Sequence, residues 1–97
     1  MHLVQLLLPA KAGTDEAFAR THDELIEIAE GVTAYVRSPA RGAWIAPGGE
    51  EAHDDVVMVE VMLSAFDRDW WRRYRQTLET RFSEQEIHIR VLPADIV

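Results

Sequence analysis

Residues 54–63 read Asp-Asp-Val-Val-Met-Val-Glu-Val-Met-Leu, which is the strongest β-strand signal in the sequence. Because side chains alternate along a strand, three valines and a leucine share one face, and Val56, Met58, Glu60 and Met62 share the other. Both faces are mainly apolar, so neither is expected to meet bulk water. A strand of this kind is typical of the middle of a sheet covered on both sides. The chain's own helices can supply one cover, and the identity of the other cover is the main functional question.

Three further segments have strand patterns. Residues 3–8 form a nearly continuous apolar run that ends at Pro9, which again favours a central strand. Residues 32–37 alternate Val, Ala and Val with Thr, Tyr and Arg. Residues 86–92 alternate equally clearly, and their two isoleucines and one valine are expected to face the core.

The link between residues 32–37 and the strand at 54–63 predicts a long hairpin. Pro39 and Gly42 interrupt the strand pattern, so we expect a kink there and a short extension through residues 43–45. The sequence Pro-Gly-Gly-Glu at 47–50 predicts the turn. The tip of this hairpin is expected to project from the body of the protein.

The first helix is expected to begin after Thr14, a suitable N-cap residue that is followed by two acidic residues. Gly31 is expected to supply the left-handed residue after its end. Five residues at helical spacing are expected to form its apolar stripe: Phe18, His22, Leu25, Ile26 and Ala29.

The second helix is expected to begin after Asp67 and to bury an aromatic stripe. The members of the stripe are Trp70 or Trp71, Tyr74, Leu78 and Phe82. The opposite face is expected to carry five arginines: Arg68, Arg72, Arg73, Arg75 and Arg81. Because acidic residues lie four positions from some of them, we interpret this face as solvated rather than as a phosphate site.

The expected order is strand, helix, strand, strand, helix, strand, which resembles the ferredoxin-like fold. The resemblance implies an α+β protein, βαββαβ, with a four-stranded antiparallel sheet in the order 4-1-3-2 and both helices on one face. It places the segments at 3–8 and 56–63 in the centre of the sheet, in agreement with their apolar faces. We expect one domain, residues 1–97.

Composition excludes several classes of function. Seventeen acidic and ten basic residues give a formal net charge of -7, which disfavours nucleic acid and anionic membrane surfaces as partners. The absence of cysteine excludes disulfides and thiolate metal sites. The apolar run at 3–8 follows no basic residue and is shorter than the roughly seven to fifteen residues of a secretory signal core. We therefore expect a soluble, cytoplasmic protein with no membrane partner.

Four runs resemble a small bacterial protein family that is functionally uncharacterised. They are Gly31-Val-Thr-Ala-Tyr35, Arg37-Ser-Pro-Ala-Arg-Gly-Ala-Trp44, Asp54-Asp-Val-Val57 and Asp69-Trp-Trp-Arg-Arg-Tyr74. The resemblance covers nearly the whole chain and implies no site residues. At the level of fold the chain is also similar to dimeric α+β-barrel proteins, in which two such sheets face each other. Those proteins include small monooxygenases, isomerases and ligand-binding modules, so the similarity implies a homodimer and no particular activity.

The sheet face turned away from the helices is the candidate functional surface, because it is apolar with a polar centre. Its expected members are Leu3, Gln5, Leu7, Tyr35, Arg37, Met58, Glu60, Met62, His88 and Arg90. Trp44, on the projecting hairpin, is a candidate binding anchor or subunit contact. His53, Asp54 and Asp55 offer metal-ligating atoms, but neighbouring residues of a strand point to opposite faces, so we predict no metal site.

Two interpretations of this surface remain open. It is either a plain homodimer interface, which we favour, or a cleft for a small organic ligand. If the protein is an enzyme, the reaction would be cofactor-independent or would use a cofactor that no motif in the sequence announces. Glu60 or His88 would then accept a proton, Arg90 would hold an anionic intermediate, and Tyr35 would complete the site.

Overall fold

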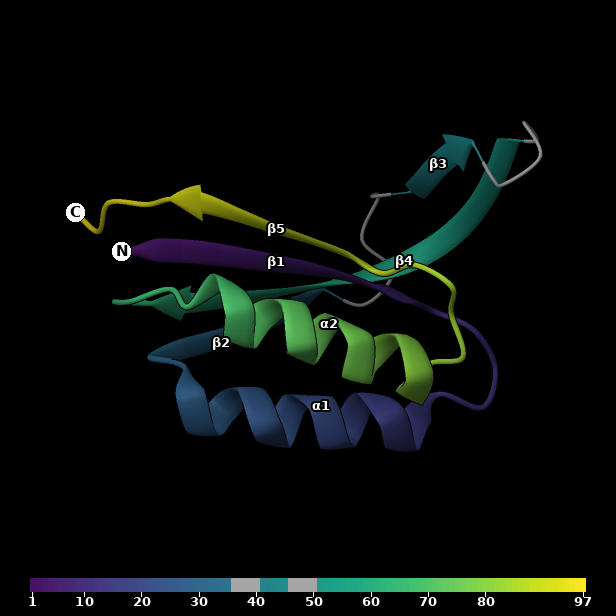
Figure 1. Cartoon of the computed structure of the whole chain (residues 1–97), viewed down its shortest axis with the longest axis horizontal. Helices are drawn as coiled ribbons and strands as arrows, with labels where there is room; N and C mark the ends of the chain where they lie inside the picture. Colours follow the sequence, from purple (N-terminus) through teal and green to yellow (C-terminus); the bar gives the residue numbers. More distant parts are fainter. Residues whose placement is uncertain (36–40, 46–50) are drawn as a thin grey trace.

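The structure is a computed structural model that describes residues 1–35, 41–45 and 51–97, with the backbone alone described for 32–35, 41–45 and 51–55. In chain order the elements are β1 (His2–Pro9), α1 (Asp15–Ile28), β2 (Gly31–Tyr35), β3 (Arg41–Ile45), β4 (Glu51–Leu63), α2 (Arg68–Arg81) and β5 (His88–Pro93). Both helices lie on one side of an antiparallel sheet (Figure 1). The expected α+β class is therefore confirmed.

The sheet has the order β2-β4-β1-β5, and β3 pairs with a separate part of β4. β1 pairs with β4 from His2 opposite Leu63 to Pro9 opposite Val56, and its other edge pairs with β5. The two strands with apolar residues on both faces thus occupy the middle of the sheet. This placement follows from their composition, because only a central strand of a covered sheet can keep both faces from water.

β4 continues beyond the sheet into a projecting hairpin arm, which we define as β3 together with Glu51–Asp55. β3 pairs with Glu51–Asp55, whereas β2 pairs with Met58 to Met62 further along the same strand. The arm rises on the side of the sheet opposite the helices (Figure 1). The predicted turn at residues 47–50 lies outside the described residues, as does most of the predicted kink.

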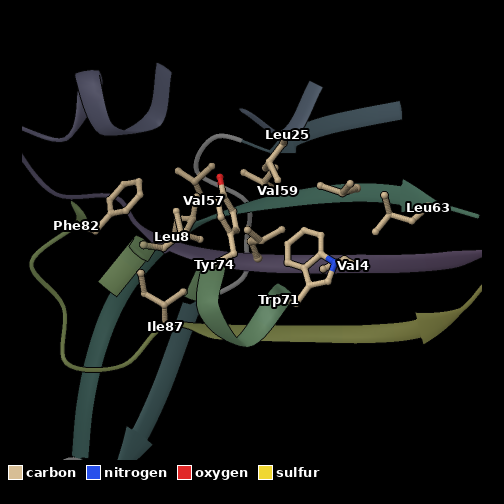
Figure 2. Packing of buried hydrophobic residues seen from close by; sticks show 13 residues of the cluster. Val4, Leu8, Leu25, Val57, Val59, Leu63, Trp71, Tyr74, Phe82 and Ile87 are labelled. Atoms are coloured by element: carbon tan, nitrogen blue, oxygen red, sulfur yellow. The ribbon is translucent and has the colours of Figure 1, made fainter. Parts of the chain in front are cut away.

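The core lies between the sheet and the two helices, and Figure 2 shows its members from close by. The sheet contributes every second residue of its central strands, as the alternation of side chains requires. The buried residues of this cluster are Val4, Leu6, Leu8, Leu25, Val57, Val59, Val61, Leu63, Trp71, Tyr74, Leu78, Phe82 and Ile87. Both apolar stripes expected from helical spacing contribute to it.

α2 follows the sequence prediction closely. The side chain of Asp67 accepts hydrogen bonds from the backbone amides of Asp69 (3.1 Å) and Trp70 (3.2 Å), so it is the expected N-cap. Trp71 is the more deeply buried of the two tryptophans. Trp70 is half-buried and stacks on the ring of Tyr74 with 4.9 Å between the ring centroids.

α1 is rotated relative to its predicted orientation. His22 and Ile26 are exposed, and Thr21 is buried in their place. Thr21 can be buried because its hydroxyl donates to the carbonyl of Ala17 (2.7 Å), which removes the cost of an unpaired polar group. The prediction of an apolar stripe through His22 and Ile26 was therefore wrong.

Both predicted ends of α1 also differ in detail. Thr14 occupies the N-cap position, but its hydroxyl donates to the carbonyl of Lys11 (2.6 Å) instead of accepting from the helix. The helix ends at an extended Ala29, and Gly31 is the first residue of β2 rather than a left-handed cap. The left-handed glycine near this helix is Gly13, with φ 82°, in the linker that precedes it.

Candidate functional site

The open face, defined as the sheet surface opposite the helices, includes three rows that run across the strands, and beyond them, next to the arm, the buried pair of Pro9 and Val56. The rows are Gly31, Met62, Leu3 and Leu92; Thr33, Glu60, Gln5 and Arg90; and Tyr35, Met58, Leu7 and His88. The outer rows are mainly apolar, and the middle row is polar throughout. Strand alternation produces this pattern, since the intervening residues of the same strands form the core.

Glu60 stands in the middle row beside Gln5, which is its direct partner in the ladder between β4 and β1. The amide Nε2 of Gln5 donates to Oε2 of Glu60 at 3.0 Å. Both side chains are half-buried. This hydrogen bond satisfies one oxygen of the carboxylate and fixes its position at the centre of the open face.

Arg90 and His88 lie on β5, at the edge of the sheet, and both are exposed. Arg90 pairs in register with Gln5, so it lies two strands from Glu60, a separation of about 10 Å between backbones. Among the side chains that the structure describes, Arg90 has no ion-pair partner. The row therefore carries a negative group near one end and a positive group at the other.

The other predicted members of the surface are less completely placed. Tyr35 lies opposite Met58 at the end of β2, which is the position expected for it. Trp44 lies in β3 opposite Ala52, on the hairpin arm. Arg37 lies outside the described residues.

Four apolar side chains of the open face are only half-buried: Leu3, Leu7, Met58 and Met62. They belong to the two central strands and surround the hydrogen-bonded pair of Gln5 and Glu60. Both described helices lie on the other side of the sheet, so they do not cover these residues (Figure 1). Apolar side chains on both sides of a polar centre, left without cover by the described helices, are typical of a surface that packs against another molecule.

A second polar cluster joins the two helices. The guanidinium of Arg81 on α2 forms two hydrogen bonds to the carboxylate of Glu24 on α1, at 2.6 and 2.9 Å. It also donates to the hydroxyl of Thr21 at 2.9 Å. The hydroxyl of Tyr74 donates to the same carboxylate at 2.9 Å. The side chain of Arg81 is only 10% exposed, so the expectation that it belongs to a solvated face was wrong.

The electrostatics of this cluster are those of a structural pair. The two hydrogen bonds from Arg81 hold the pKa of Glu24 below its usual value, and the same bonds raise the pKa of Arg81. Burial, reinforced by the hydrogen bond to Glu24, raises the pKa of Tyr74. All three groups are thereby kept in the protonation states they have at neutral pH, so none is prepared to exchange a proton.

The sequence contains a signal for this cluster that a stripe of apolar residues alone does not include. Phe18, Thr21 and Leu25 are spaced by three and four residues, which is a helical stripe once Thr21 is counted as able to be buried. Glu24 and Arg81 each neighbour a buried position on their helix. The pairing between them could not be predicted, because it depends on how α1 and α2 lie side by side.

The described residues contain no group of three or more His, Asp and Glu side chains that could hold a metal ion. The side chains of His53, Asp54 and Asp55 lie outside the described part of the chain. In the described part of the chain, neither helix combines the length and apolarity that a membrane crossing requires.

The comparisons with known proteins do not assign the chain to a group: no family model matches it, and its sequence matches no curated protein.

Proposed function

We propose that this protein is a homodimeric ferredoxin-like domain whose functional surface is the open face, packed against the same face of a second copy. The observation that carries the proposal is the half-buried apolar set on the two central strands, with Glu60 at its centre. Burying that set against a second sheet would remove it from water. The association would gain about 25 cal/mol of free energy for each square ångström of apolar surface buried.

The middle row supports a second copy as the occupant, because it is complementary to itself. Glu60 and Arg90 flank Gln5 in register, one on each side. A two-fold axis parallel to the strands and above Gln5 would place Arg90 of each copy opposite the partner's Glu60. Facing sheets lie about 10 Å apart, a gap that these two long side chains can bridge. The hairpin arm rises on the same side and would lie beside the second copy.

The first prediction is that sedimentation at micromolar concentration gives about twice the chain mass of 11.1 kDa. Leu7→Glu is expected to raise the dissociation constant at least about a hundredfold, because the change removes apolar contact and buries a charge in each copy. Arg90→Glu, at an exposed position, is expected to weaken the dimer by placing two carboxylates opposite each other.

The matched control is Thr77→Glu, which introduces the same charge on the exposed surface of α2 and should leave the dimer unchanged. Circular dichroism confirms that each variant is folded before its mass is measured. A wild-type protein that sediments at the mass of one chain would remove the proposal, and so would a dimer that Leu7→Glu and Arg90→Glu both leave intact.

A second prediction concerns the role of Glu60 in the interface. Glu60→Gln is expected to change the dissociation constant by less than about fivefold, because an amide keeps the shape and can still accept from Gln5. The double variant Glu60→Leu with Arg90→Met is expected to dimerise at least as strongly, as apolar replacements of buried pairs often do. Analytical ultracentrifugation of the two variants provides the measurement.

The outcome separates a structural role from a binding site. Loss of the dimer in Glu60→Gln would show that the interface requires the charge of the carboxylate and would contradict the small effect expected of this variant. The alternative of a cofactor-independent enzyme stays a prediction. It would be favoured if Glu60→Gln preserved the dimer and abolished binding of a small molecule that copurifies with the wild-type protein.

A further inference from the structure

A cavity of about 600 Å³ lies on the helix side of the sheet, between α1 and the strands β1 and β4. Leu8, Leu25, Val57 and Val59 lie beneath it and are at most 5% exposed, and Figure 2 shows them together on this side of the sheet. Phe18, Ala10 and Ala19 form a more exposed apolar wall. The volume lies within the range of about 300 to 1,000 Å³ that is usual for small-molecule sites.

The hydroxyl groups on the cavity wall are already engaged within the protein. Thr14 donates to the carbonyl of Lys11, and Thr21 donates to the carbonyl of Ala17 and accepts from Arg81. A hydroxyl has one hydrogen to donate, and in both residues that hydrogen is used. Any molecule inside the cavity would therefore be held mainly by apolar contact.

The charged groups of the cavity lie at its rim. Lys11, the lysine at the rim, is committed to the carboxylate of Glu84 at 2.9 Å and the carbonyl of Ser83 at 3.3 Å. Asp15 and Asp23 contribute two negative charges from α1, and the exposed ring of His22 lies between them in the sequence. Together with the net charge of -7, this rim disfavours an anionic head group.

We propose that this cavity binds one small apolar molecule that is neutral or carries a single amine at the rim, and that it excludes fatty acids and other apolar anions. The apolar part would lie on Phe18, Ala10 and Ala19, above Val57 and Val59, and an amine would point toward Asp15 and Asp23. The site is independent of the proposed dimer, because the two surfaces lie on opposite sides of the sheet.

The shape of the site is tested with a neutral fluorescent probe, phenylnaphthylamine. Its fluorescence is expected to rise saturably with the folded wild-type protein. Ala19→Trp places a large ring at the exposed wall of the cavity and is expected to weaken binding at least about tenfold. The matched control is Glu27→Trp, at an exposed position of the same helix that does not line the cavity, which should change the affinity by less than about twofold.

The charge of the site is tested with anilinonaphthalene sulfonate, a similar probe with a negative charge. The wild-type protein is expected to bind it at least about tenfold more weakly than the neutral probe. The double variant Asp15→Asn with Asp23→Asn is expected to reduce the difference between the affinities for the two probes, because it removes two negative charges from the rim. Glu16→Gln with Glu27→Gln, which removes the same charge from exposed positions of α1 outside the cavity lining, should not reduce that difference.

The location of the probe is read directly from nuclear Overhauser effects. Contacts between the neutral probe and the methyl groups of Val57 and Val59 are expected, because both valines line the cavity. Contacts restricted to Leu7 and Met58 would place the probe on the open face and overturn the proposal. No saturable binding by the wild-type protein, or binding that Ala19→Trp leaves unchanged, would overturn it as well.

Discussion

Trp71→Ala is expected to lower the free energy of unfolding by about 3 to 5 kcal/mol. The side chain of Trp71 is 4% exposed and lies in the centre of an aromatic group. Its ring centroid is 5.0 Å from that of Trp70, 5.7 Å from that of Tyr74 and 6.2 Å from that of Phe66. Removing the indole leaves a void among these rings, so both the lost transfer free energy and the cost of the cavity apply.

Urea denaturation followed by circular dichroism measures the change, and an unchanged slope of the transition shows that the same surface unfolds in both proteins. Arg73→Ala is the matched control, since Arg73 is an exposed residue of the same helix. We expect it to alter the free energy of unfolding by no more than about 0.5 kcal/mol. Equal losses for the two variants would mean that the faces of α2 are wrongly assigned.

Glu24→Ala is expected to destabilise the protein by about 3 kcal/mol. The guanidinium of Arg81 would keep its buried position but lose both of its hydrogen bonds to a carboxylate. The hydroxyl of Tyr74 would lose its acceptor at the same time. Because the side chain of Glu24 is itself 36% exposed, water can partly replace the lost carboxylate, so the expected loss is at the low end for a broken buried pair.

The control for this change is Glu27→Ala, which removes an exposed glutamate three residues later on α1. Its effect should stay within about 0.5 kcal/mol. Glu24→Gln provides a closer comparison, because it keeps an acceptor for Tyr74 while removing the charge. A cost for Glu24→Ala no larger than that of the control would show that the pair of Glu24 and Arg81 contributes nothing to stability.

The same pair predicts a dependence of stability on pH. The pKa of Glu24 is lowered below its ordinary value of 4.5 in the folded protein, so the unfolded chain takes up the proton first as the solution is acidified. The stabilisation is therefore fully present above about pH 4.5 and is lost as the pH falls toward the folded-state value. The difference in stability between wild type and Glu24→Gln should be constant near neutrality and should shrink below pH 4.5.

Much of the secondary structure followed from local pattern. The strands at residues 54–63 and 3–8 were predictable because an apolar residue at nearly every position leaves only a central strand as an explanation. Asp67 was predictable as an N-cap because aspartate is common at that position and because a helical stripe that includes Tyr74 and Leu78 begins directly after it. In each case the deciding information lay within a few residues.

The orientation of α1 could not be predicted in the same way. Scoring by hydrophobicity alone favours Ile26 over Thr21, but the structure buries Thr21 and exposes Ile26. The hydroxyl of Thr21 is satisfied by Ala17 within the helix and also by a hydrogen bond from Arg81, sixty residues later in the chain. A contact of that sequence separation leaves no local pattern, which is also why the pairing of Glu24 with Arg81 was missed.

The candidate site was predictable where it depended on strand alternation. Gln5 and Glu60 were expected on one face of neighbouring strands, and they form a hydrogen bond there. Arg90 was expected in the same row, and its ladder position opposite Gln5 agrees. The cavity beneath α1 had no signal in the sequence, because its shape is set by the distance between a helix and the sheet rather than by any run of residues.

β4 runs without interruption from the hairpin arm into the sheet, and the two parts meet at Val56. On one side of that residue the strand belongs to the hairpin arm, and on the other it belongs to the sheet. Val56 is paired with Pro9, which has no amide hydrogen to give to the ladder, and the pairing with β2 starts only at Met58. Val56 is therefore the residue at which the partners of β4 change, and it is only 7% exposed. Because one strand carries both parts, the same backbone that directs the arm also positions Glu60, four residues further along.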